Sequence, residues 1–301
     1  MAWLETDLGW HLARAALREW EAASLEAAGI VSGAIAAAPP LGLRPSLHWE
    51  RVGSGPAVLL IMGLGLSGGA WWRTIPVLSQ GLEVITFDNR GVGRSPALFH
   101  AYSTAVMADD AVSVLDAAGI ERAHVYGISL GGMVAQQLAL RHPKRVRSLV
   151  LGATYAGGAS ASRPSETVLE FLRSRLSMAH EEAARHSVQF NYSERCRSEH
   201  QDRIEEDVRQ RLTHPFPVSA YWAQMWAGAT HDTHRQLARI TAPTLIVHGD
   251  EDRMIPIENG RALARRIPGA RLRELPGTGH LYATEVPEVD LEIAAFMAEH
   301  S

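Results

Sequence analysis

A serine lies between two glycines in the stretch GISLG at 127–131, with an apolar run before it and a helix-like run after it. The pattern G-x-S-x-G at a strand-to-helix junction is typical of a sharp turn that exposes a nucleophilic hydroxyl. The N-terminus of the following helix would point backbone N–H groups and a positive dipole at negative charge forming there. Ser129 is therefore a candidate nucleophile for attack on a carbonyl carbon.

A serine hydroxyl needs a general base, and the base needs a partner that fixes its tautomer. His280 stands in the stretch LPGTGHLY after the last predicted strand, and we expect it to be the base. The acid is one of two aspartates after the apolar run TLIVHG. We favour Asp252, because the turn from Asp250 to Pro256 would carry it toward the histidine, and Asp250 would then cap that turn. The chain order Ser, Asp, His is one that such triads adopt.

Attack on a carbonyl produces an oxyanion, which needs N–H donors beside the nucleophile. One predicted donor is the backbone N–H of Leu130, the residue after Ser129. The second is the backbone N–H of Leu64, in the loop MGLG at 62–65 that follows an apolar run. Glycines in this loop would allow the backbone to approach a substrate closely.

The same loop begins a rival pattern for a dinucleotide site. Gly63, Gly65 and Gly68 form G-x-G-x-x-G, and Asp88 follows twenty positions beyond the last glycine, where an acid would bind a ribose. This pattern would follow a predicted hairpin rather than open the fold, and Asp88 leads into the glycine-rich turn NRGVGRS. A dehydrogenase would also leave the order Ser, Asp, His unexplained. An NAD-dependent oxidoreductase is therefore the weaker alternative.

Two further clusters receive plain interpretations. His231, Asp232 and His234 have a spacing that could bind a metal, but we interpret them as a solvent-facing group at the end of a helical region and predict no metal site. Asp109 and Asp110 could form an acid–base pair, but we interpret them as acids on a helix face.

Trp222, Met225 and Trp226 recur at near-helical spacing. Ordinary packing would explain this spacing, and so would the wall of a pocket for a large apolar substrate. Both interpretations stay open.

Apolar runs alternate with helix-like stretches and predict a parallel, doubly wound sheet that would position these residues. A short strand and a Gly-Ser-Gly turn before the first buried run predict a hairpin at the start of the sheet. The buried strands are predicted at Ala57–Met62, Leu82–Asp88, 123–128, 146–152 and 242–250.

The strand–helix rhythm stops near Thr154 and resumes near residue 241, with helix-like sequence and scattered aromatic residues between. We therefore predict a core at 46–153 and 241–301, interrupted by a helical lid at 154–240. Residues 1–45 are predicted to form an N-terminal helical extension with the apolar stripe Trp10, Ala13, Leu17 and Trp20. This stripe would dock on the core, cover a substrate entrance or form a homodimer contact.

The 301 residues are 46% hydrophobic and carry a formal net charge of −4, with acids and bases interspersed. That composition suits a globular core and argues against nucleic acid or an acidic membrane surface as a partner. There is no signal-peptide pattern and no apolar run long enough to span a bilayer. A single cysteine, Cys196, excludes an intramolecular disulfide. We predict a cytoplasmic protein.

The motifs together resemble the α/β-hydrolase superfamily, in its branch of small esterases, enol-lactonases and cofactor-free haloperoxidase-like proteins. The resemblance covers about Ser46 to the C-terminus and implies an α/β-hydrolase sheet with a lid. It implies a serine hydrolase, without cofactor or metal, that acts on a hydrophobic ester, thioester or lactone through an acyl-enzyme. The matching stretches are IMGLG (61–65), FDNRGVGRS (87–95), GISLGG (127–132), HGDEDRMIP (248–256) and GTGH (277–280).

The loop after the first buried strand departs from the His-Gly of many relatives. Met62-Gly63 is similar to the version in anthracycline methylesterase-like proteins, which suggests methylesterases and thioesterases of polyketide pathways, the latter acting on carrier-protein-bound acyl chains. Ser129 counts against the dehalogenases and epoxide hydrolases of the superfamily, which use an aspartate nucleophile. A haloperoxidase or perhydrolase, and a non-catalytic ligand receptor with the same fold, remain alternatives.

Overall fold

The computed structural model describes residues 47–97, 102–159, 161–213 and 216–301. It contains a seven-stranded sheet in the order β1-β3-β2-β4-β5-β6-β7, in which β1 pairs antiparallel with β3 and every other pairing is parallel. The predicted doubly wound, mostly parallel sheet is confirmed. The strands span Trp49–Gly53 (β1), Ala57–Ile61 (β2), Glu83–Phe87 (β3), Ala123–Ile128 (β4), Val146–Gly152 (β5), Thr244–Gly249 (β6) and Arg271–Leu275 (β7).

The predicted hairpin between the first two strands is wrong, because β3 lies between β1 and β2. Burial gives the reason. Every residue of β2 is buried, so this strand needs a partner on each side, whereas most of β1 is exposed, which suits an edge strand. The turn after β1 crosses the start of β3, where an added Cβ on Gly53 would lie 2.4 Å from the carbonyl oxygen of Leu82.

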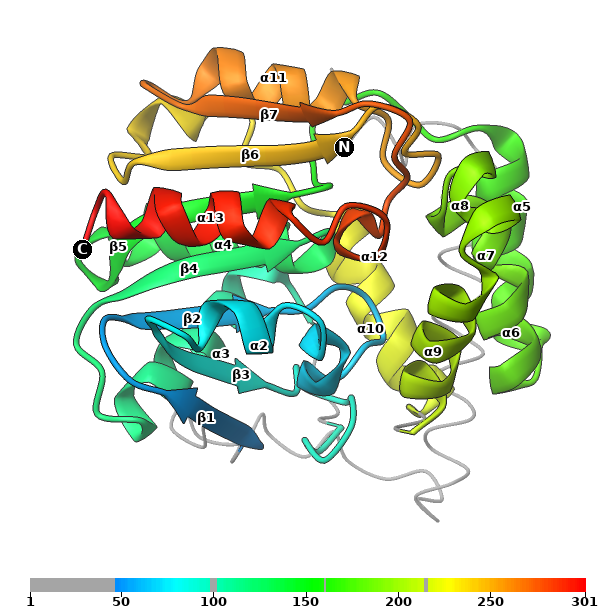
Figure 1. Ribbon diagram of the computed structural model, residues 1–301, viewed down its shortest axis with the longest axis horizontal. Helices are drawn as coiled ribbons and strands as arrows, with labels where there is room; N and C mark the ends of the chain where they lie inside the picture. The colour runs from blue at the N-terminus through cyan, green and yellow to red at the C-terminus, as the bar shows by residue number, and fades with distance from the viewer. Residues whose placement is uncertain (1–46, 98–101, 160, 214–215) are drawn as a thin grey trace, which may run out of the picture. The chain divides into compact units, whose positions relative to one another are not determined.

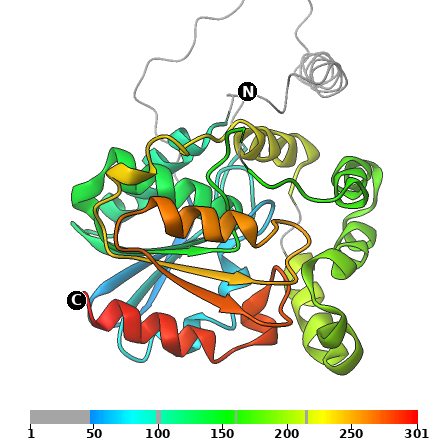
Figure 2. The same ribbon diagram turned by 90° about the horizontal axis from the view of Figure 1, so that it is seen from above.

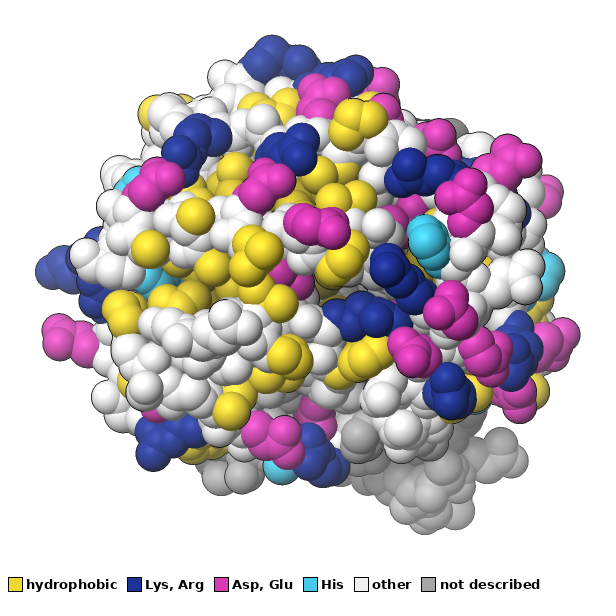
Figure 3. Space-filling model, viewed as in Figure 1, with side chains coloured by type: hydrophobic (Ala, Val, Ile, Leu, Met, Phe, Trp, Pro, Cys, Tyr) yellow, Lys and Arg dark blue, Asp and Glu magenta, His cyan; other side chains and the backbone are white. Residues whose placement is uncertain are grey.

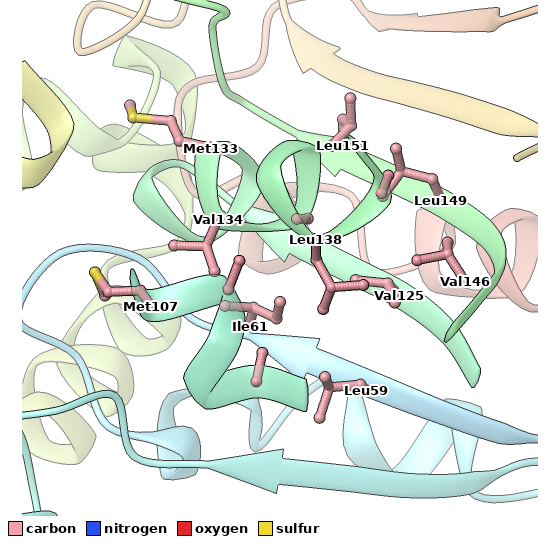
Figure 4. Close-up of a cluster of buried hydrophobic side chains, with 14 of the residues drawn as sticks. Leu59, Ile61, Met107, Val125, Met133, Val134, Leu138, Val146, Leu149 and Leu151 are labelled. Atoms are coloured by element: carbon pink, nitrogen blue, oxygen red, sulfur yellow. The ribbon is translucent and has the colours of Figure 1, made fainter. Parts of the chain in front are cut away.

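Helices cover both faces of the sheet (Figures 1 and 2). Alternate side chains of each strand pack on opposite faces, so Leu59 and Ile61 join one core and Val58 and Leu60 the other. Figure 4 shows the first of these cores, where side chains of α3 and α4 meet those of β2, β4 and β5. One face carries α2 (Ile75–Leu78) and α13 (Val289–Ala298), and the other carries α3 (Thr104–Ala117), α4 (Leu130–Arg141) and α11 (Glu258–Arg266).

Between β5 and β6 the chain runs through a series of helices within the segment that we call the lid (154–240). The parallel strands point their C-terminal ends toward these helices (Figure 1). The lid helices span Glu166–Ser174 (α5), His180–His186 (α6), Val188–Asn191 (α7), Glu194–Glu199 (α8), Gln201–Leu212 (α9) and Val218–Ala229 (α10). The remaining short helices span Gly68–Trp71 (η1), Pro143–Arg145 (η2), Arg175–Ser177 (η3), Leu237–Arg239 (η4) and Tyr282–Glu285 (α12).

Acidic and basic side chains alternate over the lid on the face shown in Figure 3. Several pair with each other, among them Arg185 with Glu181 and Glu205. Interspersed pairs of this kind produce no extended field of one sign on that face. The predicted N-terminal extension and its apolar stripe lie outside the described residues.

Candidate active site

Ser129 occupies the junction between β4 and α4 with φ +56° and ψ −120°, a conformation that non-glycine residues rarely adopt. The two flanking glycines make this turn fit. An added Cβ on Gly127 would lie 2.2 Å from the carbonyl oxygen of Gly131, and one on Gly131 would lie 1.9 Å from that of Ile61. The strand, the helix and the neighbouring strand are therefore too close for any larger side chain at either position.

Two hydrogen bonds fix the strained turn. The N–H of Ser129 donates to the Gly152 carbonyl oxygen at 2.9 Å, and the Thr154 hydroxyl donates to the Ser129 carbonyl oxygen at 2.7 Å. Both partners lie at the end of β5 or just beyond it, so the neighbouring strand holds the serine backbone in place. The Ser129 side chain stays half-exposed at the start of α4.

The structure brings His280 and Asp252 together, with 2.7 Å between His280 Nδ1 and Asp252 Oδ2. Oδ1 of Asp252 accepts hydrogen bonds from the N–H groups of Met254 and Ile255 at 2.9 and 2.8 Å. Burial favours the neutral acid, but attraction to His280 and hydrogen bonds from His280 and His248 outweigh it and lower the pKa of Asp252 to about 2. The ionised carboxylate only accepts, so Nδ1 of His280 carries the proton and Nε2 is left free as a base.

Asp250 has a different place. Its side chain is exposed, and Oδ1 accepts a hydrogen bond from the N–H of Gly277 at 2.7 Å. It therefore caps the turn before the histidine loop and makes no contact with His280 among the described hydrogen bonds. Of the two aspartates, Asp252 is the one beside the histidine.

The loop that carries His280 is fixed by residues that sequence patterns did not indicate. The N–H of Gly279 donates to the buried carboxylate of Glu285, which also accepts from the N–H of Ser193 in the lid. The N–H of Leu281 donates to the carbonyl oxygen of Asn191. The residues on both sides of His280 are thus tied to the lid. No local sequence pattern predicts that Glu285 would bind the N–H of Gly279.

Ser129 and His280 lie at the same edge of the sheet, the C-terminal ends of β4 and of the strands beyond it. An added Cβ on Gly249, the last residue of β6, would lie 2.5 Å from the Gly279 carbonyl oxygen, so the histidine loop passes directly over that strand end. Within the described residues, no hydrogen bond joins Ser129 Oγ to His280 Nε2. Such bonds often tighten only when a substrate is bound.

The loop at 62–65 faces Ser129. A Cβ added to Gly63 would lie 3.3 Å from the Ser129 Cβ. The Asn89 side chain donates to the Met62 carbonyl oxygen at 3.0 Å and holds the start of the loop. In the described part of the chain, neither the Leu64 N–H nor the Leu130 N–H donates to another protein group.

The dinucleotide alternative fails on the same loop. The carboxylate of Asp88 is almost fully buried, and its two oxygens accept the N–H groups of Gly68 at 2.8 Å and Arg94 at 2.9 Å. It therefore ties two loops together and is not open to a ribose. The glycines lead into η1, a four-residue turn of helix, rather than into the long helix of a dinucleotide fold.

The interpretation of His231 as solvent-facing needs correction. His231 is buried rather than solvent-facing, with Thr104 Oγ1 at 2.9 Å from Nδ1, and burial lowers the pKa of His231 to about 3. Asp110 lies on α3 as predicted and is buried there, where the Arg90 guanidinium binds it in a bidentate ion pair at 2.6 and 2.7 Å. Among the described residues, no group of three or more histidine, cysteine or acidic side chains is arranged to hold a metal ion.

A cavity lies between the core and the lid. On the core side Met62, Ile128 and Leu281 line it, and the last two adjoin Ser129 and His280 in sequence. Its lid side includes Gln210 and Arg211 of α9. Trp222, Met225 and Trp226 are half-buried on α10 and are not among the residues that line this cavity, so their pocket role remains a prediction.

A mostly parallel sheet with a serine at a strand-to-helix elbow and a buried Asp–His pair at the same edge defines the α/β type of hydrolase. A family model described as alpha/beta hydrolase fold matches residues 56–283. The chain belongs to this family, and the predicted resemblance is confirmed.

Individual proteins similar to this chain are also named as hydrolases or esterases. The chain is 36% identical over 265 residues to a Variovorax paradoxus protein named "Putative carbamate hydrolase RutD", covering 85% of this chain and 97% of the relative. A hydrolase from Pseudomonas aeruginosa has a similar structure at 28% identity and a TM-score of 0.74, covering 85% and 97% of the two chains. An esterase from Thermogutta terrifontis has 28% identity and a TM-score of 0.73, covering 85% and 94%. The comparisons indicate a hydrolase.

Within the described residues, no helix combines the length and apolar character needed to cross a membrane.

Proposed function

We propose that the protein is a serine hydrolase that cleaves a carboxylic ester, thioester or lactone through an acyl-enzyme. The observation that carries this proposal is the buried pair of Asp252 and His280, 2.7 Å apart, at the sheet edge where Ser129 is held in a strained turn. The ionised acid fixes the histidine with a free Nε2, which is the state a general base requires. The unused N–H groups of Leu64 and Leu130 supply the oxyanion donors.

In the first step, Nε2 of His280 takes the Ser129 proton as Oγ bonds to the carbonyl carbon, and the carbonyl oxygen becomes an oxyanion held by the two N–H groups. Collapse breaks the bond to the alcohol or thiol, which leaves with the proton from His280. Water then attacks the acyl-enzyme, gives a proton to His280, and the acid departs as Ser129 regains its proton. Asp252 stays ionised throughout.

The preference for a hydrophobic acyl or alcohol group rests on the aromatic residues of the lid and on the family resemblance. The apolar cavity lined by Met62, Ile128 and Leu281 does not settle the substrate, because neither Ser129 nor His280 lines it. A polyketide-pathway ester or a carrier-bound thioester is suggested by family analogy, from the loop Met62-Gly63 and the alanine- and arginine-rich composition. A carbamate is the second candidate class, because the relative that is 36% identical carries that name and a carbamate carbonyl can be attacked in the same way.

The test is labelling with a fluorophosphonate, followed by intact-protein mass spectrometry and turnover of p-nitrophenyl esters, thioesters and carbamates of rising chain length. The wild type should gain one phosphonyl group at Ser129. Ser129→Ala should lose labelling and at least about a thousandfold in kcat while it stays folded.

Ser198→Ala is the matched control, because Ser198 is an exposed serine on α8 that should not affect labelling or turnover. Labelling at another residue, or full activity of Ser129→Ala, would reject the mechanism. Tight ligand binding by an unlabelled wild type would favour the receptor alternative. Peroxide-dependent turnover above hydrolysis would favour the perhydrolase.

A further inference from the structure

Gln224 is a buried amide in an otherwise apolar stretch of α10, whose sequence is VSAYWAQMWAGA. Its side chain is completely inaccessible to solvent. An amide buried in this way costs free energy unless its oxygen and nitrogen both find hydrogen-bond partners. The position therefore needs an explanation beyond packing, because leucine or methionine would fill similar space without that cost.

Both ends of the amide bind backbone groups of the core. Oε1 accepts the N–H of Gly65 at 3.0 Å, and Nε2 donates to the Arg90 carbonyl oxygen at 3.0 Å. The partners leave one orientation, because a backbone N–H only donates and a carbonyl oxygen only accepts. One side chain of the lid thus joins two separate loops of the core, 62–68 and 88–95.

The hydrogen bond from the Gly65 N–H to Gln224 lies next to the Leu64 N–H, the proposed oxyanion donor. Gly65 has φ +67°, and a Cβ on it would lie 3.0 Å from the Phe216 ring and 3.1 Å from the Tyr221 ring. The Leu64 N–H is one peptide unit before the Gly65 N–H. Holding Gly65 therefore limits the rotation of the peptide that must point its N–H at the substrate oxygen.

The Arg90 end gives this link a rigid support. The guanidinium of Arg90 is almost fully buried and bound at two points by Asp110 of α3. An ion pair of this geometry fixes the arginine side chain strongly. The backbone around its carbonyl oxygen is held by two hydrogen bonds of the same turn, from the Gly91 N–H to the Pro96 carbonyl oxygen and from the Val92 N–H to the Asn89 carbonyl oxygen, both 3.0 Å. Gln224 therefore ties the oxyanion loop to an anchored part of the core, not merely to another loop.

We propose that Gln224 is a positioning residue that sets the Leu64 N–H for oxyanion stabilisation. The proposal rests on the proposed serine hydrolase function. It also implies that α10 belongs functionally with the core, since moving this helix away would release the oxyanion loop.

The test compares Gln224→Met with Tyr155→Phe. Methionine has a similar volume but makes neither bond. Tyr155→Phe is the matched control: it removes the 2.9 Å bond from the Tyr155 hydroxyl to the Gly228 carbonyl oxygen, which ties the C-terminal end of α10 to the segment just after β5. The measurements are the rate of fluorophosphonate labelling, kcat and KM on the best ester, and Tm.

Gln224→Met should slow labelling and lower kcat about 10- to 100-fold, because a misplaced oxyanion donor weakens the transition state. KM should change by less than about threefold, because ground-state binding does not use the donor in the same way. Both variants should lower Tm by similar amounts, because each loses buried hydrogen bonds. Tyr155→Phe should nevertheless leave kcat within about twofold of the wild type. This split between kcat and stability separates positioning from general loosening of α10.

If Gln224→Met labels and turns over at the wild-type rate, the proposal for Gln224 is overturned and the hydrolase function stands. If kcat falls equally in Tyr155→Phe, the effect is structural and the proposal also fails. If the wild type is not labelled at Ser129, the proposed function fails and this inference falls with it. Should Gln224→Met not fold, Gln224→Asn decides in the same assays, because its amide is one methylene too short to reach both Gly65 and Arg90. The same losses of labelling rate and kcat are then expected, and wild-type rates would overturn the proposal.

Discussion

The turn that carries Ser129 and the loop that faces it are both backbone structures, but they are held in different ways. The turn is held by the absence of side chains on Gly127 and Gly131 and by bonds to the end of the adjacent strand. The loop at 62–68 is held by side chains from distant segments: Asn89, Asp88 and Gln224. The glycines that the turn requires lie within five consecutive residues, whereas the side chains that hold the loop come from segments far away in the sequence.

This difference explains which parts of the site the sequence reveals. A sharp turn needs glycines at fixed positions, so its pattern is visible in five letters. When side chains from distant segments hold a loop, the sequence of the loop itself does not reveal them. The only sign of Gln224 in the sequence is a single amide within an apolar helix. The neighbouring Trp222, Met225 and Trp226 stand out instead as possible pocket residues.

The loop that carries Asp250 and Asp252 is partly visible in the sequence, which offers both aspartates but does not distinguish them. Replacing Asp252 has the largest expected effect. Asp252→Asn should lower kcat by about 10³- to 10⁴-fold, because the amide can no longer stabilise the imidazolium or hold the tautomer with Nε2 free. Asp250→Asn is the matched control and should cost less than about threefold, since its carboxylate only caps a turn. Steady-state kinetics of both variants on one ester checks this.

The same pair gives a pH dependence. Because the pKa of Asp252 is lowered to about 2, its carboxylate is already ionised at every pH above about 4, and it cannot cause a loss of kcat/KM between pH 8 and 5. Any such acid limb must belong to another group, and it should persist unchanged in Asp250→Asn. Equal losses in the two asparagine variants would contradict the assignment of the acid.

Gly131→Ala has the next largest expected effect, because Gly131 lies where the turn and the facing loop meet. The new Cβ would lie 1.9 Å from the Ile61 carbonyl oxygen and 2.8 Å from that of Met62. The helix start must move by about 1 Å, and kcat should fall about 100-fold, since displacements of that size disturb reacting geometry.

Gly81→Ala is the matched control, because an added Cβ there meets nothing within 4 Å. It should leave kcat unchanged and Tm unchanged or slightly higher. Near wild-type kcat in Gly131→Ala would show that the turn tolerates movement and that the local glycine pattern is not what places Ser129.

The fold itself was largely accessible from the sequence, because buried parallel strands read as continuous apolar runs and need no long-range information to be found. Their order was less accessible. The hairpin prediction failed because adjacency along the chain does not reveal that β3 inserts between β1 and β2. His231 was assigned to the surface for a related reason: the identity of one polar residue does not show that Thr104 lies opposite it.

The smallest expected effect concerns His231, just after the C-terminal end of α10. Its contact with Thr104 of α3 ties this end of the helix to the core. The folded protein keeps this buried ring neutral down to a pKa of about 3, whereas the unfolded chain takes up a proton near 6.5. Its contribution to stability is therefore complete above pH 6.5 and is lost as the pH falls toward 3, by about 1.4 kcal/mol per pH unit.

Between pH 7 and pH 5, the free energy of unfolding of the wild type should accordingly fall by about 2 kcal/mol more than that of His231→Gln, measured by urea titration. Glutamine can still bind a threonine hydroxyl but has no proton to take up. His234→Gln, at a half-exposed ring three positions along, is the control and should fall as the wild type does. Equal falls in the wild type and His231→Gln would mean that the ring is not held neutral in the fold, and that this end of α10 is less firmly tied to the core than the Gln224 end.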